Sequence, residues 1–102
     1  MFSEIVAHKQ ELDRLCHRFG VRRLELFGSA SSDAASASVG DLDFLVDLGD
    51  APPVAYADAY FGLLESLESL FGRPVDLVTE PSVSNRYFRE SIARSRRLLY
   101  AA

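Results

Sequence analysis

The chain has 102 residues and a formal net charge of −4, with 48% hydrophobic and 25% charged residues. These values are typical of one soluble globular domain, residues 1–102, and they argue against a disordered or fibrous protein. No apolar run approaches the roughly 20 residues that span a bilayer, and the first residues lack the basic start of a signal peptide. We therefore expect a cytoplasmic protein without a membrane partner.

Charge is distributed unevenly along the chain. Residues 41–80 carry nine acidic side chains against one basic side chain, Arg73, whereas residues 81–102 carry five arginines against Glu90. The acidic middle favours cations and argues against a nucleic-acid partner, and the basic end could meet a phosphate or an acidic protein. A solvated surface is the alternative interpretation of both segments.

The apolar pattern and the positions of glycine and proline predict about four helices and three strands. In chain order these are a helix over residues 2–19, a strand over 21–27, one or two helical turns from 29, a strand over 41–48, a helix over 54–71, a strand over 74–79 and a helix from 85 to about 100. Cys16 is the only cysteine, which excludes an internal disulfide or a cysteine metal cluster.

The order of these elements predicts an α/β (α+β) fold with a small mixed sheet of three strands. The strands over 41–48 and 74–79 are joined by a long helix, and such a crossover makes the two strands parallel with right-handed chirality. We take the strand over 21–27 as antiparallel to the strand over 41–48. That pairing brings the turn after the first strand next to the start of the second.

Two aspartates, Asp41 and Asp43, begin the second predicted strand. Alternate residues of a strand point to the same face, so the two carboxylates converge. Unpaired carboxylates side by side repel each other unless a cation lies between them. Mg²⁺ suits this position because it prefers carboxylate oxygens and completes its shell with waters and substrate phosphates.

Gly28 and Ser29 follow the first predicted strand and fit a phosphate site. Glycine lets the backbone approach a ligand closely, and serine is a good first residue for a helix whose N-terminal N–H groups favour an anion. The stretch from Ser29 to Val39 is rich in alanine and serine. A flexible surface loop is the alternative interpretation of this stretch.

A third aspartate, Asp76, interrupts an otherwise apolar strand. A charged side chain there is costly unless something charged meets it. Parallel pairing places Asp76 and Asp41 at the same edge of the sheet, which predicts a common cation site. The alternative is a carboxylate at a strand end that is satisfied by a turn or by Arg73.

The three features together resemble the DNA polymerase beta-like nucleotidyltransferase superfamily, and in particular its minimal nucleotidyltransferases. They are the Gly28-Ser29 turn, the Asp41-Leu42-Asp43 motif before an apolar run, and Asp76 on the next strand. The resemblance covers nearly the whole chain. One departure is the stretch after Ser29, where the family commonly carries an arginine and this chain has Ala30-Ser31-Ser32-Asp33.

The resemblance implies a metal-dependent nucleotidyltransferase. Asp41 and Asp43 would hold two Mg²⁺ ions, and Asp76 would complete one metal site and help to deprotonate the acceptor. Gly28 and Ser29 would bind phosphates of ATP. Minimal members of this family are typically antitoxins of HEPN/MNT toxin-antitoxin systems, and their chemistry is transfer of AMP from ATP to a tyrosine of a HEPN-domain ribonuclease toxin.

Two other functions are compatible with the sequence. The first is a non-catalytic antitoxin that neutralises its partner by covering its surface, although such a protein has no reason to keep three carboxylates at one sheet edge. The second is transfer to RNA or to a small hydroxyl substrate, which needs a groove that a chain of this length can hardly build. We expect a complex with a cognate toxin, or a homodimer in its absence.

Overall fold

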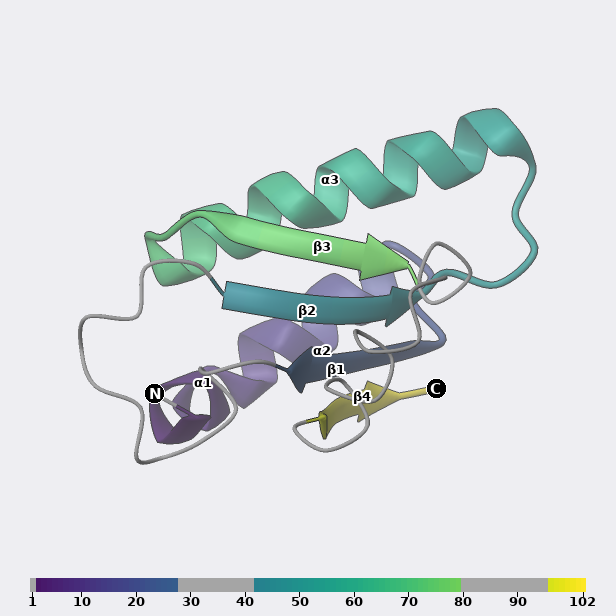
Figure 1. The fold of residues 1–102 in the computed structure, drawn as a ribbon. Helices are drawn as coiled ribbons and strands as arrows, with labels where there is room; N and C mark the ends of the chain where they lie inside the picture. Colours follow the sequence, from purple (N-terminus) through teal and green to yellow (C-terminus); the bar gives the residue numbers. More distant parts are fainter. Residues whose placement is uncertain (1, 28–41, 80–95) are drawn as a thin grey trace, which may run out of the picture.

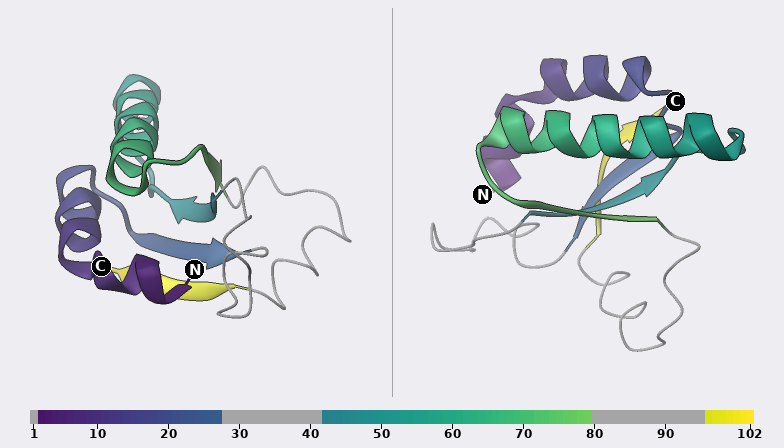
Figure 2. Two further views of the ribbon diagram at one scale, coloured as in Figure 1. Left: turned by 90° about the vertical axis from the view of Figure 1, so that its left-hand side faces the viewer. Right: turned by 90° about the horizontal axis from the view of Figure 1, so that it is seen from above.

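The computed structural model describes residues 2–27, 42–79 and 96–102, which form a four-stranded mixed sheet with helices on one face (Figure 1). The elements in chain order are α1 (Phe2–Ala7), α2 (Lys9–Arg18), β1 (Arg23–Phe27), β2 (Leu42–Asp47), α3 (Pro53–Phe71), β3 (Val75–Thr79) and β4 (Arg97–Ala101). Helices α2 and α3 lie side by side against the same face of the sheet (Figure 2).

The strands lie in the order β3-β2-β1-β4. β1 is antiparallel to β2 and to β4, whereas β2 is parallel to β3. The two predicted pairings are therefore confirmed. The crossover helix α3 begins after Pro52 and ends at Gly72, which has a φ of +62° and a backbone N–H that donates to the carbonyl of Glu68. Glycine suits this left-handed position at the end of a helix.

The core lies between the helices and one face of the sheet. Strand residues alternate between the two faces, so Leu24 and Leu26 of β1 and Phe44 of β2 enter the core, while the residues between them face away. Helix α3 contributes Leu63 and Leu67, which are fully buried. A smaller apolar cluster on the opposite face consists of Phe27, Leu45 and Val78.

The prediction of a helix up to residue 100 is wrong at its end, because Arg97–Ala101 forms the strand β4. β4 pairs with the edge of β1 and satisfies backbone groups that an open edge would expose, which overrides the helical preference of this arginine- and leucine-rich run. The earlier part of the predicted helix, from 85 to 95, and the helical turns predicted from residue 29 lie outside the described residues.

The predicted helix over residues 2–19 is divided at His8 into α1 and α2. The N–H of His8 donates to the carbonyl of Ile5 at 3.0 Å, three residues back, which tightens the turn relative to an α-helix. The imidazole of His8 meets the ring of Phe71 edge to face, with the ring centroids 5.5 Å apart. Among the described residues, no helix has both the length and the apolar character needed to cross a membrane.

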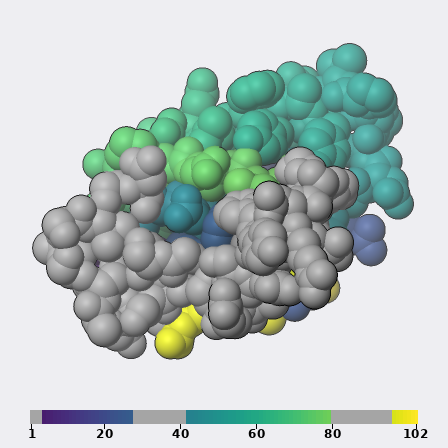
Figure 3. Space-filling model, viewed as in Figure 1, coloured from purple at the N-terminus to yellow at the C-terminus, as the bar shows by residue number. Residues whose placement is uncertain are grey.

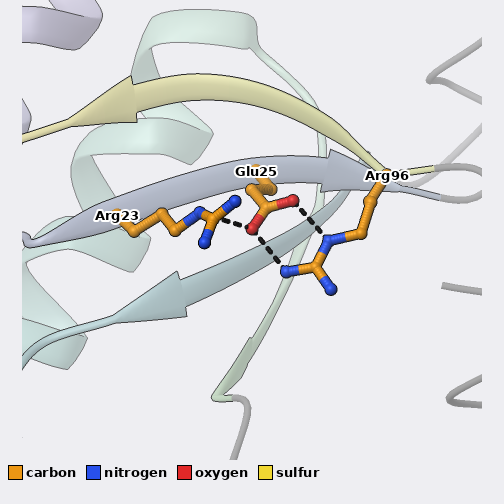
Figure 4. A network of polar contacts seen from close by, with 3 residues as sticks. All are labelled: Arg23, Glu25 and Arg96. Carbon is orange, nitrogen blue, oxygen red and sulfur yellow. Dashed lines mark hydrogen bonds and ion pairs between the residues drawn. The ribbon is translucent and has the colours of Figure 1, made fainter. Parts of the chain in front are cut away.

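The buried carboxylate of Glu25 on β1 binds Arg96, the residue that precedes β4 (Figure 4). Only 3% of the Glu25 side chain is exposed, and both of its oxygens accept hydrogen bonds of 2.6 Å from Nε and Nη2 of Arg96. Nε of Arg23 lies 2.9 Å from the same carboxylate. The hydrogen bond from Arg96 holds the pKa of Glu25 below its ordinary value, burial opposes this shift, and the positive charges of Arg96 and Arg23 add to it.

We predict that Leu67→Ala lowers the free energy of unfolding by about 2–5 kcal/mol, because it removes a fully buried side chain and leaves a cavity. Leu98→Ala is the matched control, since the side chain of Leu98 is 54% exposed and its truncation should change stability by about 0.5 kcal/mol or less. Urea denaturation followed by circular dichroism measures both. Equal losses would contradict the assignment of Leu67 to the core.

We also predict an acid-sensitive contribution from Glu25. Its pKa is lowered in the folded protein, so the ion pairs contribute stability above the ordinary pKa of 4.5 and lose it as the pH falls through the lower folded-state value. The free energy of unfolding of the wild-type protein should therefore fall more between pH 7 and pH 3 than that of Glu25→Gln. Glu65→Gln, at an exposed position on α3, should behave like the wild type. Parallel pH profiles for the wild-type protein and Glu25→Gln would contradict this prediction.

Candidate active site

Asp43 and Asp76, hereafter the carboxylate pair, lie directly opposite each other on the parallel strands β2 and β3. Neighbouring strands are about 4.8 Å apart, so the two residues are immediate neighbours. Asp43 is half-buried and Asp76 is exposed. The structure thus brings together two of the three aspartates that the sequence predicts for a common site.

The carboxylate pair lies on the face of the sheet that points away from α2 and α3. Leu42 and Phe44, which flank Asp43, are buried in the core, so Asp43 points to the opposite face. Leu77, which follows Asp76, is also buried in that core. The two carboxylates therefore lie on the face of the sheet opposite α2 and α3, hereafter called the open face because neither of these helices packs against it.

The end of β1 lies beside the carboxylate pair, because Phe27 is opposite Asp43 in the antiparallel register. The chain continues from Phe27 into Gly28 and Ser29, which lie outside the described residues, as does Asp41. The structure does not test the roles predicted for these three residues. It does establish that β1 ends at the edge of the sheet where the carboxylate pair stands, as the predicted phosphate and metal sites require.

Helix α3 holds β3 in place on both sides of Asp76. The N–H of Val75 donates to a side-chain oxygen of Glu68 at 3.1 Å, and the hydroxyl of Tyr60 donates to the carbonyl oxygen of Leu77. Burial, followed by the negative charge of Asp76, raises the pKa of Tyr60, so this hydroxyl keeps its proton and remains a donor. These two bonds fix the backbone that carries Asp76.

The donor set of the site suits a hard divalent cation. Among residues 2–27, 42–79 and 96–102, no three His, Cys, Asp or Glu side chains come together as a metal site, so the carboxylate pair would need a further ligand. Asp41, two residues before Asp43, is the candidate that the sequence offers. Carboxylate oxygens together with substrate phosphates and waters are the ligands that Mg²⁺ prefers.

Sequence reasoning missed the Glu25–Arg96 pair on the same face of the sheet. The signal was present, because Glu25 stands in an apolar strand just as Asp76 does, and a buried charge there requires a partner. The partner, however, is 71 residues away in the sequence, where no local pattern can indicate it.

Comparisons with known proteins agree with this geometry. The family model for the nucleotidyltransferase domain matches residues 8–99. Protein adenylyltransferase MntA of Thermococcus cleftensis is 39% identical over 83 residues, which cover 81% of this chain and 77% of that relative. A solved structure named as a candidate minimal nucleotidyltransferase is 28% identical with a TM-score of 0.66, and the match covers 94% of this chain and 93% of that one.

A solved complex of tri-AMPylated Shewanella oneidensis HEPN toxin with MNT antitoxin contains a chain with the same fold. The TM-score is 0.62 at 19% identity, and the match covers 100% of this chain and 74% of that one. Both the family model and the relative from Thermococcus cleftensis extend over the strands that carry the carboxylate pair and over most of the described residues. This chain therefore belongs to the nucleotidyltransferase domain family, among its minimal members.

Proposed function

We propose that the chain is an antitoxin that transfers AMP from ATP to a hydroxyl group, that of a tyrosine, on a cognate HEPN-domain ribonuclease toxin. The observation that carries this proposal is the carboxylate pair on the open face of the sheet, at the edge where β1 ends, in a chain of the nucleotidyltransferase family. The relative from Thermococcus cleftensis is a protein adenylyltransferase, and the complex of the same fold contains an AMPylated toxin.

Each predicted site residue has a role in this proposal. Asp41 and Asp43 would hold two Mg²⁺ ions, and Asp76 would complete one of the two sites. When bound, Mg²⁺ would supply positive charge that screens the triphosphate from the carboxylates and stabilises the attacking and leaving oxygens. Gly28 and Ser29 bind the phosphates through backbone N–H groups and the serine hydroxyl.

The reaction is an in-line displacement at the α-phosphorus of ATP. The hydroxyl oxygen of the acceptor forms a bond to the α-phosphorus, while the bond from that phosphorus to the bridging oxygen breaks and pyrophosphate leaves. Asp76 accepts the proton of the hydroxyl group. Its exposed position on the open face supports this role, because a side chain of a second protein can reach it.

The first half of α3 is the candidate surface for the partner. Its side chains include Val54, which is 77% exposed, and Phe61, which is 60% exposed. The helix forms a continuous stretch of the molecular surface (Figure 3). Exposed apolar side chains that gather on one element often mark an interface. In the absence of the toxin, the same surface would join two copies of the chain as a homodimer.

Binding of ATP should depend on Mg²⁺ or Mn²⁺, because two carboxylates without a cation repel a triphosphate. Calorimetric titration with ATP in the presence of Mg²⁺ and in the presence of EDTA tests this expectation. Asp43→Asn should remove the metal-dependent binding, because it takes away one carboxylate of the pair that would hold the cation. Equal binding of ATP in Mg²⁺ and in EDTA would contradict the two-metal site.

The partner should carry AMP when it is co-expressed with the wild-type protein. Mass spectrometry of the partner should show an increase of one or more AMP units, which Asp43→Asn and Asp76→Asn abolish. Asp50→Asn, at an exposed position outside the carboxylate pair, is the matched control and should leave the modification intact. A partner that is unmodified, yet inhibited equally by the wild-type protein and Asp43→Asn, would instead establish the non-catalytic antitoxin.

A further inference from the structure

Asp76 lies in β3, which stands at one end of the order of the described strands. β2 occupies one side of β3, and on that side the carbonyl oxygen of Pro74 accepts the N–H of Leu42 at 3.1 Å. Successive residues of a strand present their backbone groups to alternate sides. The backbone groups of Asp76 therefore point toward β2, whereas those of Val75 and Leu77 point to the outer side of β3.

Two side chains of α3 bind the outward backbone groups of β3. The N–H of Val75 donates to Oε2 of Glu68 at 3.1 Å, and the hydroxyl of Tyr60 donates to the carbonyl oxygen of Leu77. Helix and strand run side by side here (Figure 1). An edge strand without such partners leaves these groups to water. Asp76 is thus held by β2 on one side, while its two neighbours are held by α3 on the other.

The hydroxyl of Tyr60 lies close to the carboxylate whose strand it binds. Its acceptor belongs to Leu77, the residue directly after Asp76. After burial, the negative charge of Asp76 contributes to the raised pKa of Tyr60, so the two groups interact electrostatically. The ring of Tyr60 packs against the core and meets the ring of Phe61 edge to face, with the centroids 5.2 Å apart. Packing of the ring therefore directs the hydroxyl toward β3.

The separation of the carboxylate pair depends on the backbone of β3. Asp76 is exposed, and an exposed side chain is restrained mainly through the backbone that carries it. A cation shared by the pair requires both carboxylates at coordination distance at the same time, and Mg²⁺ tolerates little departure from octahedral geometry. A shift of β3 relative to β2 would therefore weaken such a site without removing any ligand.

We propose that Tyr60 and Glu68 are positioning residues, which hold Asp76 where the carboxylate pair shares a cation. This inference rests on the proposed function, because it concerns the metal site that would bind the nucleotide. Neither side chain touches the cation or the substrate in this role. Both act through the backbone of β3, and the partners that orient a metal ligand commonly affect metal affinity as strongly as this role requires.

The affinity for Mn²⁺, measured by electron paramagnetic resonance on the full chain without nucleotide, tests the role of Tyr60. Tyr60→Phe keeps the ring and removes one hydroxyl, so it should weaken the binding of Mn²⁺ by about threefold to tenfold, the range expected for one hydrogen bond. An unchanged affinity would overturn the proposal.

Tyr56→Phe is the matched control. Tyr56 is half-buried against the same core and lies one turn earlier on α3. Because Glu68 contacts the start of β3 and Tyr60 its middle, this earlier turn lies further from Asp76. Tyr56→Phe should leave the affinity for Mn²⁺ unchanged. A loss equal to that of Tyr60→Phe would contradict a specific role of the Tyr60 hydroxyl.

A background that carries Asp76→Asn separates positioning from a general loss of stability. This background should still bind Mn²⁺ through Asp41 and Asp43, only more weakly. If Tyr60 acts through the carboxylate of Asp76, Tyr60→Phe should cause no further loss there, because the group that it positions is gone. The same fold loss in both backgrounds would show an effect on stability alone and would overturn the positioning role.

Glu68 allows an independent test with a conservative variant. Glu68→Gln keeps a side-chain oxygen that can accept the N–H of Val75, whereas Glu68→Leu does not. The affinity for Mn²⁺ should stay close to that of the wild-type protein in Glu68→Gln and fall by about threefold or more in Glu68→Leu. Equal losses in the two variants would assign the effect to the charge of Glu68 and not to its hydrogen bond.

Amide hydrogen exchange in the metal-free protein tests whether the effect is local. Tyr60→Phe should speed exchange in β3 and leave β1 unchanged, whereas equal acceleration in both strands would indicate global destabilisation and contradict the proposal. A wild-type protein that binds no Mn²⁺ would overturn the metal site and this inference together. A protein that binds Mn²⁺ with the expected pattern among the variants, yet transfers no AMP, would overturn the proposed function alone.

Discussion

The pairing of β2 with both of its neighbours is the constraint on which the site depends. β2 is antiparallel to β1 and parallel to β3, so the end of β1 and the starts of β2 and β3 meet at one edge of the sheet. A slip of one residue in the register of β2 would turn Asp43 into the core and Phe44 toward solvent. The burial of Leu42 and Phe44 therefore keeps Asp43 on the open face, opposite the carboxylate of Asp76.

Helix α3 fixes the position of β3 beside β2. Leu63 and Leu67 anchor the helix in the core, while Tyr60 and Glu68 bind the backbone of β3 on either side of Asp76. Since the helix also supplies the crossover between β2 and β3, one element determines the direction of β3, its distance from the core and the placement of its carboxylate. Asp76 is therefore exposed to solvent, while buried side chains and hydrogen bonds of α3 hold the backbone of its strand in place.

Local patterns in the sequence predict most of the fold and only part of the site. Three strands and the long helix follow from apolar periodicity and from the glycine and proline positions that bound them, and the helical crossover predicts the parallel pairing of β2 and β3. The antiparallel pairing of β1 and β2 was adopted because it brings the Gly28-Ser29 turn next to the aspartates, and the structure confirms it. β4 could not be predicted in this way, because a strand that pairs with β1 across the chain is defined by a non-local contact, and Leu98-Leu99-Tyr100 is too short to show a period. Glu25 was missed for the same reason, since its partner Arg96 is remote in sequence.

The acidic residues on the open face differ in their burial. Glu25 is buried and is neutralised by two arginines of the chain itself, which keep its pKa low. Asp43 is half-buried and Asp76 is exposed, so both residues are more exposed than Glu25. In the described part of the chain, this face therefore has the more exposed carboxylates on β2 and β3, and a buried carboxylate on β1 that is bound by arginines. A divalent cation would bind more readily to the carboxylates on β2 and β3, because Glu25 would first have to give up its hydrogen bonds with Arg96.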